Sequence, residues 1–124
     1  MVLHESGEMY LETIYILSQE SSSVRSIDIG AYMGYSKPSV SRAIRLLKNE
    51  GLVTTDGQGY IKLTAEGEEK AARIYERHTL LTQLFVNLGV DEKTAAQDAC
   101  RIEHYLSDKT FDAIKAHSEK YGKK

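Results

Sequence analysis

The feature that most constrains the fold is a change in the spacing of apolar residues near position 52. Before it, apolar residues recur at helical spacing in three segments, which begin near residues 7, 26 and 36. Between Leu52 and Leu63 they form two short runs on either side of Asp56-Gly-Gln-Gly59, the pattern of a β-hairpin with a tight turn. Helical spacing then returns and continues toward the C-terminal end. The chain is therefore expected to be mainly α with one small β-hairpin.

Capping residues predict where the first helices begin and end. The first runs from about Gly7 to Ser18. Ser26 is the expected N-cap of a short helix through Met33, closed by Gly34. Ser36 caps a third helix, which has Pro38 in its first turn and stops at Gly51. Its apolar residues form one stripe for burial: Val40, Ala43, Ile44 and Leu47. This order is that of a winged helix-turn-helix.

Three further helices are expected after the hairpin. The first is capped by Thr64 and runs to about Leu88, with His78 on its apolar stripe. The second is capped by Asp91 and runs to about Leu106, and the third begins at Ser107. We therefore expect a winged helix-turn-helix domain over residues 1–64 and a helical domain over residues 65–124.

Composition excludes several classes of protein. The 124 residues carry a formal net charge of −2 and are 41% hydrophobic, which argues against disorder and against coating nucleic acid by bulk charge. A lone cysteine, Cys100, suits a reducing compartment. The uncharged stretch from Thr79 to Val90 is too short to span a bilayer, and no export signal is visible at the start. The expectation is a cytoplasmic protein with no membrane partner.

The third helix has the charge expected of a DNA-reading helix. Between Ser36 and Asn49 the charged residues are Lys37, Arg42, Arg45 and Lys48, a local sum of +4 without an acid. A solvated basic face is the alternative, but it leaves the preceding short helix, glycine turn and following hairpin unexplained. The candidate DNA-binding residues are Ser36, Lys37, Pro38, Ser39, Ser41, Arg42, Arg45 and Lys48.

A second cluster has the donors of a transition-metal site. Cys100, Glu103 and His104 are expected on one helix face, at spacings of three and four residues. Thiolate, carboxylate and imidazole together suit a transition metal better than magnesium or calcium. Met9 and Glu12 share a face of the first helix, and His78 lies on the long one. A purely structural role for the cysteine and histidines stays open on spacing alone.

An enzymatic interpretation is weaker. Cys100-x-x-Glu103-His104 is similar to the H-x-x-E-H signature of zinc peptidases, with cysteine in place of the first histidine. Such an enzyme needs an open metal position and a substrate cleft, and the chain leaves no room for a catalytic domain beside the winged helix. We therefore expect no catalytic residues, no organic substrate and no enzyme activity.

The chain resembles the diphtheria-toxin-repressor family of metal-dependent transcriptional repressors. The resemblance rests on six segments that cover nearly the whole chain: Glu8 to Tyr15, Ser36 to Ser41, Glu50 to Val53, Thr64 to Gly67, Arg77 to Leu81 and Ala99 to Asp108. It implies an N-terminal winged helix, a helical dimerisation and metal-binding domain, and a homodimer. Bound divalent metal then activates the homodimer for palindromic operator DNA.

The resemblance also implies a ligand set. Met9, Cys100, Glu103 and His104 match the ligands of the family's activating site, with methionine and cysteine where the iron-responsive branch has them. The manganese-responsive branch has aspartate and glutamate there. The expected cofactor is Fe(II), with Mn(II), Co(II), Ni(II) or Zn(II) able to bind in vitro.

The match to the second metal site of the iron branch is incomplete. His78 is present, but Thr82 and Ala96 replace a glutamate and a histidine of that branch. For a chain ending at Lys124 the resemblance implies the short form, expected to lack the SH3-like domain that adds ligands in many members. Glu12 instead matches a carboxylate of the manganese branch, so a second site of Glu12, His78 and Glu103 is the alternative.

The expected function is metal-dependent transcriptional repression of metal-homeostasis genes. Two alternatives remain: a manganese-responsive regulator of the same family, and a winged-helix regulator that senses a small organic ligand.

Overall fold

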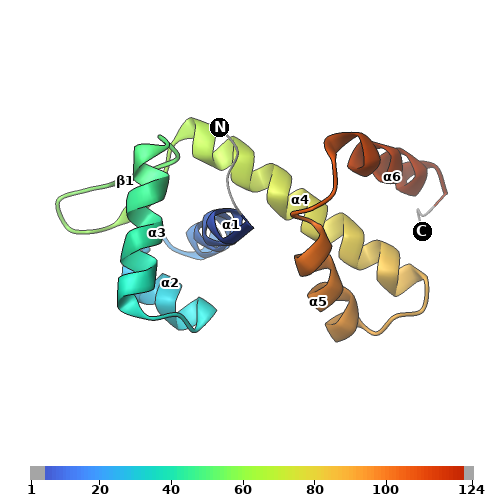
Figure 1. Cartoon of the computed structure of the whole chain (residues 1–124), viewed down its shortest axis with the longest axis horizontal. Helices are drawn as coiled ribbons and strands as arrows, with labels where there is room; N and C mark the ends of the chain where they lie inside the picture. The colour runs from blue at the N-terminus through green and yellow to red at the C-terminus, as the bar shows by residue number, and fades with distance from the viewer. Residues whose placement is uncertain (1–4, 122–124) are drawn as a thin grey trace. The chain divides into compact units, whose positions relative to one another are not determined.

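The computed structural model describes residues 5–121, which form six helices and a two-stranded sheet. Residues 1–72 and 73–124 make two compact units, and the boundary between them falls inside one long helix. The elements in order are α1 (Glu5–Glu20), α2 (Ser26–Met33), α3 (Lys37–Asn49), β1 (Val53–Thr55), β2 (Ile61–Leu63), α4 (Ala65–Asn87), α5 (Glu92–Ile102) and α6 (Asp108–Tyr121) (Figure 1). The predicted fold class, a mainly α chain with a winged helix-turn-helix, is confirmed.

The first unit is a three-helix layer completed by the hairpin. Helix α1 packs against α2, α3 and β2, and α3 also contacts β1. The two strands are antiparallel, with Val53 opposite Leu63 and Thr55 opposite Ile61. The buried apolar residues of this unit come from its helices, its strands and the segments that join them: Tyr10, Leu11, Ile14, Val24, Ile29, Val40, Ile44, Leu47, Leu52, Val53, Ile61 and Ala71. Ala43, expected in the same stripe, is only half-buried.

The turn of the hairpin is held by one aspartate. The Asp56 carboxylate accepts the backbone N–H groups of Gln58 and Tyr60, at 2.9 and 3.0 Å. These bonds stabilise the ionised carboxylate and hold the pKa of Asp56 below its usual value. The Asp-Gly-Gln-Gly tetrapeptide therefore closes the wing through its side chain as well as through its glycines.

Two of the three caps predicted around the helix-turn-helix are confirmed. Gly34 ends α2 in the left-handed conformation, with φ 74°, and Ser36 caps α3 by accepting the Ser39 N–H. The third prediction was wrong, because Ser26 is the first residue of α2 and Arg25 occupies the cap position. The Asp28 carboxylate accepts the Arg25 N–H at 2.9 Å, which is the reciprocal bond of a capping box, from the first turn back to the cap residue.

Thr64 caps α4 as predicted, and its hydrogen bonds also link this helix to the start of the hairpin. Its hydroxyl accepts the Gly67 N–H at 3.0 Å and donates to the Gly51 carbonyl at 2.7 Å. Its backbone N–H donates to the Leu52 carbonyl at 3.0 Å. The start of α4 is therefore bonded directly to the chain that enters the hairpin.

In the second unit, α4 is bonded to α6 and to Glu103, the residue that follows α5. Ile74 and Leu81 are buried along α4, whereas Tyr75 is 40% exposed and Leu88, just after the helix, is 72% exposed. Lys115 of α6 forms a 2.6 Å ion pair with Glu76 of α4, and the hydrogen bond to that carboxylate raises the pKa of Lys115. Among residues 5–121 there is no helix with the length and apolar content needed to cross a membrane.

Candidate functional site

Helix α3 has an apolar face and a basic face. Val40, Ile44 and Leu47 are buried against the rest of the first unit. The candidate DNA-binding residues lie on the remaining surface of the helix and at its start. Ser36, Lys37, Pro38, Arg42, Arg45 and Lys48 are exposed, and Ser39 and Ser41 are half-buried. The arrangement leaves four cations available to phosphates or base edges along about three turns of helix.

Side-chain hydrogen bonds order part of this surface. The Ser36 hydroxyl lies 3.0 Å from that of Ser39, which in turn accepts from Arg42 Nη2 at 3.4 Å. At the other end of the helix, Lys48 Nζ donates to the Thr55 hydroxyl of β1 at 3.1 Å. Lys48 therefore links the reading helix to the wing, while an ammonium keeps two further donors for another partner.

Two tyrosines connect α1 to the helix-turn-helix, and sequence reasoning did not identify this contact. The Tyr10 ring of α1 lies 5.8 Å, centroid to centroid, from the ring of Tyr35 in the turn before α3. Both rings, with Arg42, line a shallow pocket of about 400 Å³. Burial, together with the nearby Tyr35, raises the pKa of Tyr10. The tilted ring pair means that α1 and the turn resist moving independently.

The candidate ligands Met9 and Glu12 lie on α1, three residues apart on one face of the helix. Met9 is half-buried, and the Glu12 side chain is buried. The Thr13 hydroxyl donates to the Met9 carbonyl at 2.9 Å, within the helix. The backbone that carries Met9 and Glu12 is therefore regular α-helix.

In the second unit the candidate ligands gather around Glu103. One carboxylate oxygen lies 2.9 Å from His78 Nδ1, and the other lies 3.2 Å from His104 Nε2. The Glu103 side chain is fully buried and that of His104 is 1% exposed. The structure thus brings His78 of α4 together with Glu103 and His104, three of the residues that the sequence indicated as candidate ligands.

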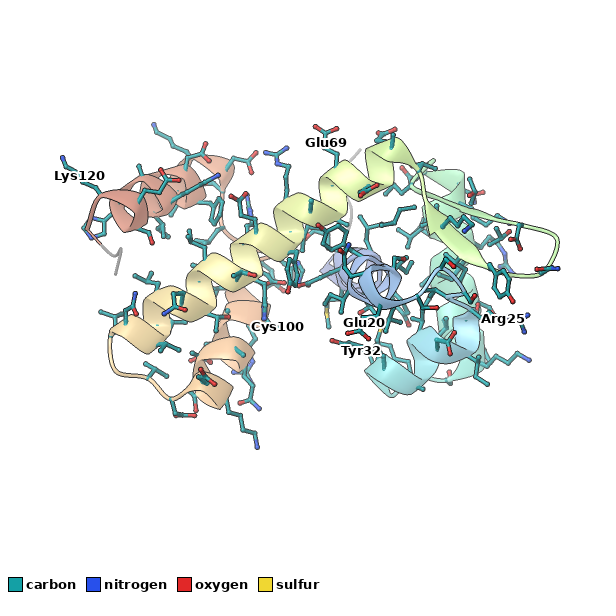
Figure 2. The ribbon with its side chains drawn as sticks, turned by 180° about the vertical axis from the view of Figure 1, so that it is seen from behind. Glu20, Arg25, Tyr32, Glu69, Cys100 and Lys120 are labelled. Carbon is teal, nitrogen blue, oxygen red and sulfur yellow. The ribbon has the colours of Figure 1, made fainter. Side chains whose placement is uncertain are left out.

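The prediction that all of Cys100, Glu103 and His104 lie on a helix was wrong. Helix α5 ends at Ile102, and residues 103–105 form a turn before α6 begins at Asp108. Glu103 keeps helical dihedral angles and donates its N–H to the Ala99 carbonyl at 2.9 Å, so it stays in register with Cys100. Cys100, labelled on α5 in Figure 2, is half-buried. Beyond the end of the helix, Arg77 of α4 bonds the carbonyls of Glu103 and Leu106.

The chemistry of this cluster fits a divalent cation. A buried carboxylate is costly unless a positive charge compensates it. Protonation of His78 or His104 would supply one charge, but a divalent ion would supply more while both imidazoles remain neutral ligands. Carboxylate and imidazole are donors that first-row transition metals accept, and Cys100, three residues before Glu103, carries a thiol that they also accept.

The residues that replace ligands of the iron branch's second site offer little to a metal. Ala96 has no donor, and Thr82 offers only a hydroxyl, which is buried without a hydrogen-bond partner among the described residues. His78, the remaining member, is bonded to Glu103. The second-site chemistry available in this unit is therefore centred on Glu103.

Two family models cover the chain almost completely. Residues 2–61 match the N-terminal DNA-binding domain of iron-dependent repressors, and residues 64–122 match the metal-binding and dimerisation domain of the same proteins.

Individual relatives agree with these matches. The chain is 35% identical to transcriptional regulator MntR of Escherichia coli O157:H7 over 115 residues, which cover 93% of this chain and 74% of MntR. It is 31% identical to iron-dependent repressor IdeR of Mycobacterium tuberculosis over 107 residues, covering 86% of this chain and 46% of IdeR.

A solved structure supports the same conclusion. The manganese regulator SloR superposes with a TM-score of 0.82 at 28% identity, covering 96% of this chain and 55% of SloR. The chain thus spans about half the length of IdeR and SloR and three quarters of MntR. With both family models and these relatives in agreement, the chain belongs to the diphtheria-toxin-repressor family of metal-dependent transcriptional repressors.

Proposed function

We propose that this protein is a cytoplasmic, homodimeric repressor whose affinity for palindromic operator DNA rises when it binds Fe(II). The observation that carries the proposal is the buried Glu103 carboxylate between two imidazoles, in a chain that also has a basic reading helix. The metal site has a regulatory role in this proposal and no catalytic one.

The activating ion is assigned to ligands from both parts of the sequence. Met9 and Glu12 of α1 would act with Cys100, Glu103 and His104, the residues that match the family's ligand positions. His78, bonded to Glu103, would take part in a second ion site with Glu12 and Glu103. A bound cation supplies the positive charge that the buried carboxylates require.

The first unit suits a rigid reading head. Because Tyr10 contacts Tyr35, and α1 packs on both α2 and α3, the orientation of α1 is coupled to that of the reading helix. A bias on the position of α1, through Met9 and Glu12, therefore becomes a bias on the whole head. Ser39, Arg42 and Arg45 are then assigned to the operator, with arginine suited to bidentate contacts with guanine.

The proposed preference for iron rests on two soft donors. Met9 and Cys100 offer thioether and thiolate sulfur, which favour Fe(II) and later metals over Mn(II). Manganese is the second candidate, because Glu12, Glu103 and His78 could form a harder oxygen- and nitrogen-rich site. SloR, a manganese regulator, is also among the similar structures.

We expect a divalent metal to raise operator affinity by about 5- to 150-fold, the range of typical allosteric coupling. Operators would be selected from a random duplex library with Co(II) present, and affinity then measured anaerobically with Fe(II), Mn(II), Co(II), Ni(II) or Zn(II). The Co(II) form should show a thiolate charge-transfer band that Cys100→Ser removes. Affinity that does not change with saturating metal would rule out the proposal.

Replacing Arg42 with alanine should weaken operator binding by about 5- to 150-fold, the cost of losing an arginine contact to a base. Arg42 is exposed on α3 and bonded to Ser39, so its loss leaves the buried face of the helix intact. Fluorescence anisotropy at several salt concentrations would measure the change. Lys93→Ala, which removes an exposed cation from α5, is the control and should leave the affinity within about twofold. Equal losses in the two variants would show that only bulk charge matters.

A further inference from the structure

We propose that Arg77 is a positioning residue for the metal centre, because its guanidinium holds the turn that carries Glu103 and His104. The inference rests on the proposed function, since it treats those two residues as ligands. Arg77 itself has no place in that ligand set. It belongs to α4 and directly precedes His78.

Arg77 uses several donors on one short segment. Nη1 donates to the Glu103 carbonyl at 3.0 Å and to the Leu106 carbonyl at 2.8 Å. Nη2 donates to the Asp108 carboxylate at the start of α6. The guanidinium also lies over the Phe111 ring, 5.2 Å from its centroid. The Arg77 side chain is only 16% exposed, so water competes weakly for these bonds.

These bonds hold the connection between two helices. Residues 103–107 lie between α5 and α6, and the Glu103 and Leu106 carbonyls point to a donor outside both helices, Nη1 of Arg77. Just after Leu106, Ser107 caps α6 by accepting the Thr110 N–H at 3.1 Å. Arg77 therefore bonds both ends of the segment 103–106.

Two neighbouring residues of α4 thus bond the backbone and the side chain of Glu103. Arg77 bonds its carbonyl oxygen, and His78 bonds its carboxylate. The Glu103 N–H is held separately by the Ala99 carbonyl. A metal ligand held at its backbone and at its side chain loses little freedom on binding, and removal of such supporting contacts typically lowers metal affinity by about 10- to 100-fold.

The geometry requires arginine rather than a positive charge alone. A guanidinium presents its donors in a flat fork, which matches two carbonyls and a carboxylate while its face covers Phe111. A lysine ammonium at position 77 is a point charge and cannot reproduce this set. Arg73 provides a matched comparison. It is 69% exposed and approaches the Asp108 carboxylate only to 3.9 Å.

The test compares Co(II) affinity in the full-length protein and its variants, measured anaerobically from the ligand-field absorption. We expect Arg77→Lys to lower the affinity by about 10- to 100-fold and to change the band intensities, which report coordination geometry. Arg73→Ala should stay within about twofold of the starting protein, because an exposed ion pair contributes little. Arg77→Lys binding Co(II) with unchanged affinity and spectrum would overturn the proposal.

Phe111→Leu separates positioning from general stability. It trims the ring under the guanidinium while leaving the donors of Arg77 intact. Thermal unfolding in EDTA would give the metal-free stability of both variants. If they lose Co(II) affinity in proportion to that stability, Arg77 has no specific role. If Arg77→Lys does not fold, Asp108→Asn replaces it and should still weaken Co(II) binding. An unchanged affinity in that variant would also count against the proposal.

Failure of this inference is distinguishable from failure of the proposed function. If the starting protein itself binds no Co(II), or if His104→Ala binds it equally well, the ligand assignment fails. If the starting protein binds Co(II) through those ligands and Arg77→Lys matches it, only the role of Arg77 fails.

Discussion

Replacing His104 with alanine is expected to abolish the metal response of operator binding. The His104 side chain is almost wholly buried and lies 3.2 Å from the Glu103 carboxylate. Its removal takes away a nitrogen ligand and leaves a space beside a buried acid, so the affinity for metal should fall by at least about 100-fold. Operator affinity with saturating Fe(II) or Co(II) should then equal that of the metal-free protein.

The same variant should keep its dimer and its weak metal-independent binding to DNA, because α3 is untouched. Anisotropy with and without metal, elemental analysis and analytical ultracentrifugation would measure the three properties. His117→Ala, at an exposed position of α6, is the matched control and should respond to metal as the starting protein does. His104→Ala with a full metal response would refute the assignment of this ligand.

The architecture could be predicted because its signals are local. Helical spacing identified the buried face of α3, and Ser36 and Gly34 marked the turn before it. The Asp56 turn likewise follows from residues that are neighbours in the chain. The cap of α2 was misassigned because the helix already includes Ser26, one residue earlier than its side chain indicates. Ser26 has a capping side chain, but the Asp28 carboxylate reaches the Arg25 N–H from inside the first turn.

The candidate site shows the limit of such signals. The spacing of Cys100, Glu103 and His104 indicated candidate donors but extended α5 past its real end. The turn that follows the helix is bonded by Arg77, which lies 26 residues before Glu103 and donates to its carbonyl. The Tyr10–Tyr35 contact was missed for the same reason, because one ring comes from α1 and the other from the turn before α3. A pattern of residue types carries no information about which distant side chain reaches a backbone carbonyl.

Gly67→Ala is expected to destabilise the winged-helix unit severely. Gly67 lies in the first turn of α4, where its N–H bonds the Thr64 hydroxyl. A methyl group there would stand 1.9 Å from the Leu52 carbonyl oxygen and 2.8 Å from its carbon. The obstacle is backbone, so it cannot move aside as a flexible side chain could. The start of α4 must shift away from the hairpin, at a cost of about 3 kcal/mol or more.

Thermal unfolding of the full chain would measure this effect, and a loss of that size should lower the midpoint by roughly 10 °C or more. Gly57→Ala in the hairpin turn is the matched control, because a methyl group there meets nothing within 4 Å. Its effect should stay within about 0.5 kcal/mol. If both variants unfolded at the same temperature, the contact between Leu52 and Gly67 would not set the spacing of wing and helix. A large loss of stability in Gly67→Ala alone would show why the Thr64-Ala-Glu-Gly67 segment requires glycine at its last position. The first turn of α4 packs directly on the backbone of Leu52, which leads into the hairpin, and leaves no space for a side chain.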